Sequence, residues 1–167
     1  VLIAMGACLV IGWINGFIVV KLRVNSFIAT LGMSQVVAAI IRNIHDGGQI
    51  NGELSDTYRS FGKGDIFAFD WPGTGSEIAL PWYFLYGLII TIIVYYVLEH
   101  TPVGRHMFAT GGNPEAARLS GINTDRITWG GLVASAALAG FAGLVYSFKV
   151  GIYTTSFGSP LLFPAVA

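Results

Sequence analysis

Long apolar runs alternate with polar connections along the 167 residues of the chain. Four of these runs are long enough, or nearly so, to cross a bilayer, at residues 1–20, 27–44, 82–98 and 127–148. A helix rises about 1.5 Å per residue, so about 20 residues cover a hydrocarbon core of about 30 Å. The pattern predicts an all-α fold, a polytopic membrane helix bundle with about four spanning helices.

The run at residues 27–44 differs from the other three because it is shorter and more polar. It contains Thr30, Ser34, Gln35 and Arg42. Two interpretations of this run stay open at the level of sequence. It can be a tilted span, or it can be a broken and partly re-entrant one.

Charged residues are distributed unevenly over the connections. Lys21 and Arg23 follow the first run, and residues 99–126 contain three arginines. Residues 45–80 hold six carboxylates against two basic residues: Asp46, Glu53, Asp56, Asp65, Asp70 and Glu77 against Arg59 and Lys63. Basic connections collect on the cytoplasmic side of a membrane. We therefore predict an external loop at 45–80 and a cytoplasmic connection at 99–126, which requires the second run to cross.

Composition agrees with a membrane protein, since 54% of the residues are hydrophobic and only 11% are charged. Soluble domains carry about 25% charged residues. The chain opens inside an apolar run without an initial methionine, and a new apolar run begins at residues 161–167. We therefore expect residues 1–167 to be a single transmembrane domain, cut at both ends from a longer protein.

Small residues four positions apart occur in the first and fourth runs. Such spacing lets two helix backbones approach closely in lipid. The predicted helix-packing residues are Gly12, Gly16, Ala136, Gly140 and Gly143. The alternative is that they are ordinary glycines and alanines of membrane helices.

Several uncharged polar side chains lie at membrane depth, where each needs a hydrogen-bond partner or a water-filled path. They are Asn15, Thr30, Ser34 and Gln35. Two interpretations remain: these residues line a polar pathway, or they bond to neighbouring helices and backbones.

The connection at 99–126 contains the signals of a short helix. Asn113 is a good N-cap and Pro114 fits the first helical position. Glu115 and Arg118 suit the two ends of the helix dipole, and Gly121 suits a left-handed C-cap. Two turns are marginally stable alone in water, so the bundle or a partner should hold this helix. A capped connector without any partner is equally compatible with the residues.

Several motifs resemble one known family as a set. They are Thr101-Pro102-x-Gly104-Arg105, Gly112-Asn113-x-Glu115-Ala116-Ala117-Arg118-Leu119-Ser120-Gly121-Ile122-Asn123, Asn15-Gly16 and Phe27-Ile28-Ala29-Thr30-Leu31-Gly32-Met33. In order and spacing they resemble the permeases of ABC-type monosaccharide importers of the ribose, xylose and arabinose kind. The resemblance covers nearly the whole chain. At residues 159–167 the chain departs from the glutamate-leucine-aspartate motif common in that family, which leaves the sugar open.

The resemblance implies a coupling helix that docks on an ATP-hydrolysing subunit. It would comprise Asn113, Pro114, Glu115, Ala116, Ala117, Arg118, Leu119, Ser120 and Gly121, with Glu115, Arg118 and Leu119 at or near the contact. The implied partners are an ATP-binding subunit, a second permease copy or close paralogue, an external substrate-binding protein and the lipid bilayer. The implied location is the bacterial inner membrane.

Other classes find little support in the sequence. There is no phosphate-binding G-x-x-x-x-G-K-[ST] motif, no Cys/His metal spacing and no catalytic triad, so we expect no enzyme activity, metal, cofactor or nucleic-acid partner. The main alternative is a secondary transporter or channel that works without ATP. No carboxylate, lysine or histidine lies in the middle of a span, which leaves a proton relay little to use. A membrane scaffold is a weaker alternative.

Overall fold

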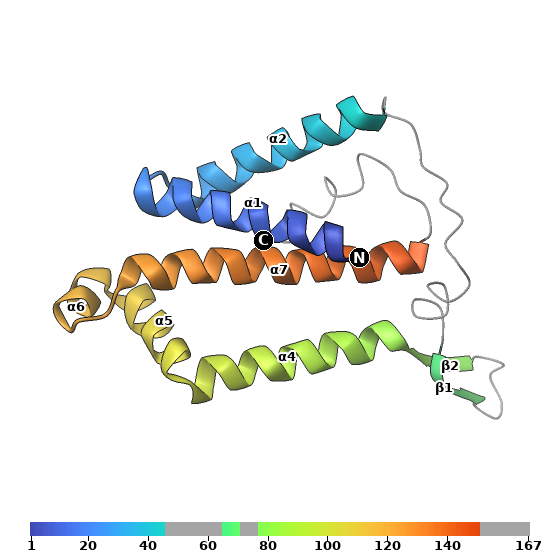
Figure 1. The fold of residues 1–167 in the computed structure, drawn as a ribbon. Coiled ribbons are helices and arrows are strands. Elements are labelled where there is room, and N and C mark those ends of the chain that lie inside the picture. Colours follow the sequence, from blue (N-terminus) through green and yellow to red (C-terminus); the bar gives the residue numbers. More distant parts are fainter. Residues whose placement is uncertain (46–64, 71–76, 151–167) are drawn as a thin grey trace.

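The computed structural model describes residues 1–45, 65–70 and 77–150 (Figure 1). Four long helices lie roughly along one direction: α1 (Leu2–Lys21), α2 (Ser26–His45), α4 (Trp82–His100) and α7 (Thr124–Val150). All four are long and apolar enough to span a membrane. The predicted all-α bundle with four spanning helices is therefore confirmed. The apolar run predicted at residues 161–167 lies outside the described residues.

The second spanning segment is one uninterrupted helix. α2 begins at Ser26, where the Asn25 side chain accepts a hydrogen bond from the backbone of Phe27 at 2.9 Å, and it continues to His45. Its polar residues do not break it, because two of the hydroxyls bond to carbonyls of the same helix. The Thr30 hydroxyl donates to the Ser26 carbonyl at 2.8 Å, and the Ser34 hydroxyl to the Leu31 carbonyl at 2.7 Å.

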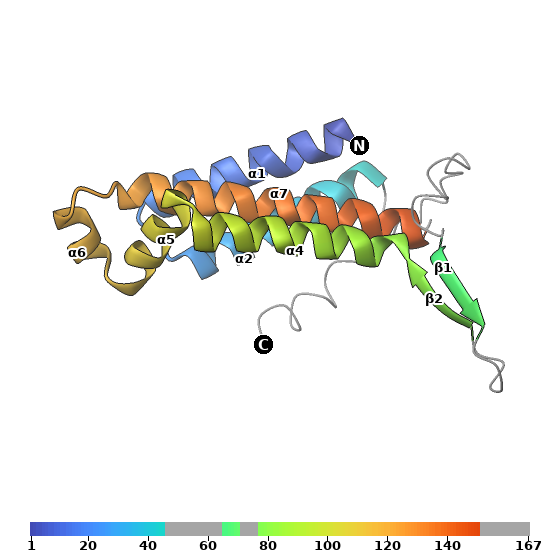
Figure 2. The ribbon, with the colours of Figure 1, turned by 90° about the horizontal axis from the view of Figure 1, so that it is seen from below.

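The most extensive helix contact joins α1 to α7, two segments far apart in the sequence (Figures 1 and 2). A Cβ added at Gly12 would lie 2.6 Å from the Cβ of Ala136, and one at Gly140 would lie 2.7 Å from the Cys8 sulfur. A Cβ at Gly16 would overlap the Trp129 ring. Four of the five predicted packing residues thus lie in this contact, whereas a Cβ at Gly143 meets no described atom within 4 Å.

Aromatic rings extend the same contact beyond the glycines. The ring of Trp129 on α7 lies 5.5 Å from that of Trp13 and 6.3 Å from that of Phe17, centroid to centroid. Tilted and edge-on pairs at these distances are favourable beyond the area they bury. The missing Cβ of Gly16 makes room for the indole, so glycine and tryptophan act as one packing unit.

α4 lies alongside α7 but is more loosely packed (Figure 1). No residue of α4 is buried, and a cavity of about 490 Å³ separates the two helices. At one end the Lys149 ammonium of α7 sits 4.5 Å from the centre of the Tyr83 ring. The apolar surface of α4 is suited to lipid or to further helices.

A short hairpin precedes α4 and was not predicted from the pattern. Strand β1 (Asp65–Asp70) pairs antiparallel with β2 (Glu77–Pro81), from Asp70 opposite Glu77 to Asp65 opposite Pro81, with an irregularity between Asp65 and Phe67. It lies at the end of the bundle away from α5 and α6 (Figure 1). The remainder of the predicted external loop 45–80, residues 46–64 and 71–76, lies outside the described residues.

The connection predicted at 99–126 contains more helix than expected. α5 (Pro102–Gly112) precedes α6 (Pro114–Leu119), and α7 starts at Thr124 rather than Ile127. The Thr101 hydroxyl accepts a hydrogen bond from the Gly104 backbone at 3.4 Å, which caps α5. Gly104 packs so closely on the Leu98 backbone that a Cβ there would overlap it. Glycine at this position therefore permits the sharp turn between α4 and α5.

Candidate functional site at the helical connection

The N-terminus of α6 is capped by a single side chain. The Asn113 side-chain oxygen accepts hydrogen bonds from the backbone of Glu115 at 3.1 Å and of Ala116 at 3.0 Å. Pro114 occupies the first turn, where its missing N–H costs nothing. Two of the backbone donors left free at a helix start are thereby satisfied.

The C-terminus of α6 is closed by a Schellman motif. The Gly121 amide donates to the Arg118 carbonyl at 2.9 Å, and the Ile122 amide donates to the Ala117 carbonyl at 3.0 Å. Gly121 has φ +82°, a left-handed conformation that favours glycine. The chain therefore leaves α6 in a fixed direction, toward the start of α7.

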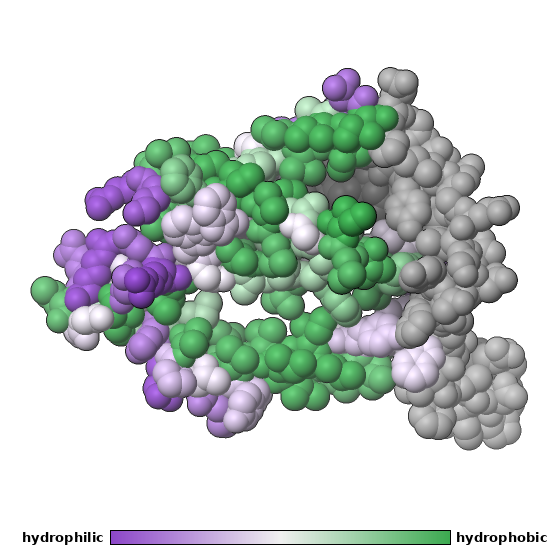
Figure 3. Space-filling view, viewed as in Figure 1, coloured by the Kyte–Doolittle hydropathy of each residue, from purple (hydrophilic) through white to green (hydrophobic). Residues whose placement is uncertain are grey.

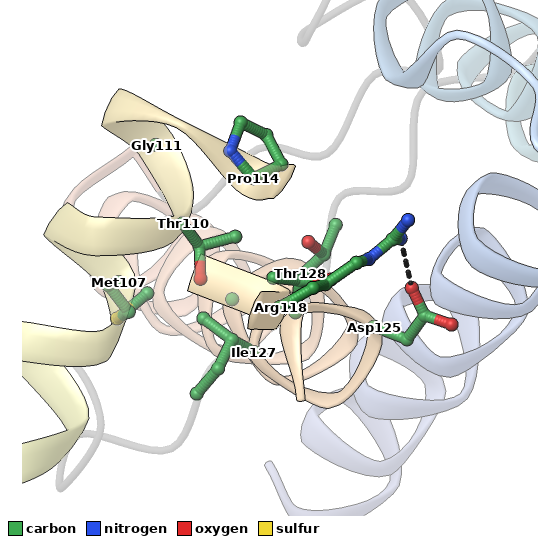
Figure 4. A pocket seen from close by; sticks show the side chains of 10 residues that line it. Met107, Thr110, Gly111, Pro114, Arg118, Asp125, Ile127 and Thr128 are labelled. Atoms are coloured by element: carbon green, nitrogen blue, oxygen red, sulfur yellow. Dashed lines mark hydrogen bonds and ion pairs between the residues drawn. The ribbon is translucent and has the colours of Figure 1, made fainter. Parts of the chain in front are cut away.

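Arg118 joins α6 to α7 directly (Figure 4). Its Nε donates to the Thr124 hydroxyl at 2.7 Å, and its Nη2 lies 3.0 Å from Oδ1 of Asp125. Thr124 is buried, while the side chains of Arg118 and Asp125 are more than half exposed. The exposed ion pair contributes at most about 1 kcal/mol. Together with the backbone hydrogen bonds at Gly121, it fixes the orientation of α6 relative to α7.

α6 packs inward through Ala117 and is otherwise exposed, with an open face that includes Leu119 and Glu115. Ala117 is 4% exposed, whereas Leu119 is 92% exposed. Glu115 is also exposed. Because α6 is fixed at both ends, Leu119 and Glu115 are held outward at the tip of the bundle. Figure 3 shows hydrophilic residues gathered at this end and hydrophobic residues along the helices.

A pocket of about 350 Å³ lies beneath α6, between α5 and α7 (Figure 4). Its lining includes Met107, Thr110, Pro114, Arg118 and Ile127. The Thr110 hydroxyl is buried and has no hydrogen-bond partner among the described residues. No group of three His, Cys, Asp or Glu side chains in the described part of the chain could hold a metal ion. α6 is a surface helix that is supported from below by α5 and α7.

The polar residues predicted at membrane depth lie away from α6. Asn15 is 8% exposed on α1, and its side-chain oxygen has no hydrogen-bond partner among the described residues. Thr30 and Ser34 bond to the backbone of α2, as described above, and Gln35 is exposed on that helix. No hydrogen bond between described residues links any two of these four side chains.

Sequence reasoning missed the residues at the start of α7. Thr124 and Asp125 receive the Arg118 side chain, and the Asn123 side chain caps α7 by accepting from the Arg126 backbone at 3.1 Å. Asn123-Thr124-Asp125 is itself a typical helix start. Because these three residues are polar, the apolar pattern predicts a span that begins only at residue 127.

Comparison with known proteins places the chain in a family. All of residues 1–167 match the family described as the permease component of the branched-chain amino acid transport system. The chain belongs to this permease family. Permeases of this family are transport components rather than catalytic ones, and the four long apolar helices identify the chain as a multi-pass membrane protein.

Several curated relatives of this permease are similar over most of the chain. The ribose import permease protein RbsC of Haemophilus influenzae is 34% identical over 140 residues, covering 84% of this chain and 41% of the relative. The galactose/methyl galactoside import permease protein MglC of the same organism is 32% identical over 170 residues, covering 98% and 47%.

The fructose import permease protein FrcC of Rhizobium meliloti is 32% identical over 155 residues, covering 85% of this chain and 39% of the relative. The chain thus spans less than half the length of these curated relatives. No solved structure matches it significantly.

Proposed function

We propose that this permease is part of the membrane-spanning subunit of an ATP-driven importer of a small sugar in the bacterial inner membrane. It would couple to a separate ATP-binding subunit and work with a second permease copy and an external substrate-binding protein. The names of the sugar import permeases that it resembles over 84% or more of its length support this proposal.

The observation that carries the coupling role is the open face of α6. Leu119 is 92% exposed on a helix of six residues that is capped at both ends and tied to α7. A single exposed leucine is ordinary. A leucine held outward on a fixed helix at the end of the bundle, beside the exposed Glu115, is suited to docking on a partner. Leu119 and Glu115 are therefore the proposed contact residues.

Arg118 has a different proposed role from Leu119 and Glu115. The resemblance put it at or near the ATPase contact, but its guanidinium already bonds to Thr124 and Asp125 within the chain. We propose that Arg118 positions α6 and that Leu119 makes the contact. Loss of Arg118 would then weaken coupling indirectly, by loosening the helix.

The test is to replace Leu119 by Asp in the full-length permease and to measure co-purification of the ATP-binding subunit. Burying a leucine contributes about 1.5–3 kcal/mol, so we expect at least about a tenfold loss of association and of sugar uptake. Val103→Asp is the matched control, because Val103 is also exposed at this end of the bundle, but on α5. Normal assembly and uptake with Leu119→Asp would reject the docking role.

A deletion strain separates the proposed ATP-driven import from transport without ATP. Deletion of the ATP-binding subunit should abolish uptake of the sugar. Uptake that persists in the deletion strain would instead favour the secondary transporter or channel.

Among the predicted pathway residues, Gln35 is the one that we place on the substrate path. Its side chain is exposed on α2, whereas Asn15 is buried. The hydroxyls of Thr30 and Ser34 are taken up by their own helix. Gln35→Ala should raise the KM of uptake without lowering the amount of assembled transporter. An unchanged KM would remove Gln35 from the path.

A further inference from the structure

A second pocket at the α6 end of the bundle has a different character from the one beneath α6. It measures about 450 Å³ and lies between the α1–α2 turn and the start of α7, with Arg118 of α6 at its edge. One part of its lining is apolar, formed by Val19, Val20 and Val24. The other part is polar and charged, with Arg23, Arg118 and Asp125. An amphipathic ligand would satisfy both parts.

The charges in this pocket are unbalanced. Arg118 and Asp125 pair with each other at 3.0 Å. Arg23 is exposed and forms no ion pair with any residue that the structure describes. The pocket therefore retains one positive charge, carried by a guanidinium that is free to bind an anion.

The backbone fixes Arg23 at this point of the turn. Its φ is +55°, a left-handed conformation that residues other than glycine rarely adopt. Glycine would suit the turn better, so turn geometry alone does not explain an arginine there. The positive-inside pattern accounts for a basic residue on this side of the membrane, but not for its place at a left-handed position that lines the pocket.

We propose that this pocket binds the headgroup of an anionic phospholipid, with the Arg23 guanidinium on the phosphate. A guanidinium matches the oxygens of a phosphate with two parallel N–H donors. Basic pockets between spanning helices at the membrane surface are suited to anionic headgroups. Val19 and Val20 lie at the end of α1 and Val24 in the turn that follows, where the three side chains can receive the glycerol and the upper acyl chain. A free phosphate ion has nothing to place against them, which favours the lipid.

The binding test uses the purified full-length permease in mild detergent, mixed with equal amounts of phosphatidylglycerol and phosphatidylcholine. Native mass spectrometry then counts the lipid retained. One basic residue near a membrane surface contributes about 1 kcal/mol to anionic lipid binding. Arg23→Gln should therefore reduce retention of phosphatidylglycerol about fivefold and leave phosphatidylcholine unchanged. Arg105→Gln is the matched control, since Arg105 is exposed on α5 and does not line the pocket.

Two further variants separate lipid binding from folding. Arg23→Gly removes the charge but suits the left-handed backbone, so it should lose the lipid while melting at the same or a higher temperature. Asp125→Asn removes the competing carboxylate and should increase retention of phosphatidylglycerol. Equal retention by wild type, Arg23→Gln and Arg23→Gly would overturn the proposal.

A third arm distinguishes other anionic partners. Millimolar inorganic phosphate should not displace phosphatidylglycerol from the wild-type permease. Displacement by phosphate alone would identify a site for soluble anions instead. Loss of the ATP-binding subunit from Arg23→Gln, with lipid retention unchanged, would identify a protein contact and would also overturn the lipid proposal.

Discussion

At the scale of single residues, the ends of α6 were the most predictable part of the candidate site. The sequence predicts Asn113 as the N-cap, and its side chain accepts two backbone hydrogen bonds there. It predicts Gly121 as a left-handed C-cap, and the φ of Gly121 is +82°. Capping depends on local backbone geometry, so sequence alone reveals it. The partners of Arg118 could not be predicted, because they depend on how the chain returns after Gly121.

Removal of the Asn113 cap gives the first residue-scale prediction. Asn113→Ala should destabilise α6 by about 1 kcal/mol, because two backbone donors lose their acceptor. Hydrogen exchange of the α6 amides should accelerate about fivefold, as measured by mass spectrometry on the full-length permease. Asn113→Asp keeps a capping oxygen and serves as the control. Equal acceleration in both variants would show that the cap contributes little.

At the scale of elements, the spacing of small residues predicted that helices pack closely but not which helices meet. Gly12, Gly16, Ala136 and Gly140 lie in one contact between α1 and α7, which are more than 100 residues apart in sequence. Trp129 was missed because a lone tryptophan in an apolar run carries no periodic signal. α5 was not predicted, because its paired glycines and low hydrophobicity give no signal of a spanning or buried helix.

The α1–α7 contact gives an element-scale prediction. Gly12→Val would place side-chain atoms against Ala136, and overpacking of this kind costs about 1–3 kcal/mol. The full-length permease should therefore melt at a lower temperature in detergent. Gly6→Val is the control on the same helix, because a Cβ there meets no described atom within 4 Å. Similar melting temperatures for the two variants would contradict the packing role.

At the scale of the whole molecule, the two basic connections meet at one end. The α1–α2 turn, with Lys21 and Arg23, lies at the same end as α5 and α6 (Figure 1). This arrangement agrees with alternate crossings, since the charge pattern had put both connections on the cytoplasmic side. The hairpin of β1 and β2 lies at the other end, and alternation of apolar and polar runs gave no sign of it.

The predicted sidedness can be tested by labelling. In a Cys8→Ser background, Leu119→Cys should react with a membrane-impermeant maleimide only after the cytoplasmic side is exposed. Ser55→Cys, in the predicted external loop, should react from the outside in intact spheroplasts. The opposite labelling pattern would reverse the predicted orientation of the permease.

One residue serves two helices at the tip of the bundle. The Asn113 amide donates to the Ala109 carbonyl at 3.1 Å and closes α5, while its side chain caps α6. Asn113 is the single residue between the two helices. At the other end of α5, Gly104 packs closely against the Leu98 backbone at the end of α4. If a partner displaces Leu119, we expect the movement to pass to α5 and then to α4, because no loop lies between α5 and α6 to absorb it. We expect the Arg118 side chain and the turn at Gly121 to pass the same movement to α7, so that two spanning helices would move together.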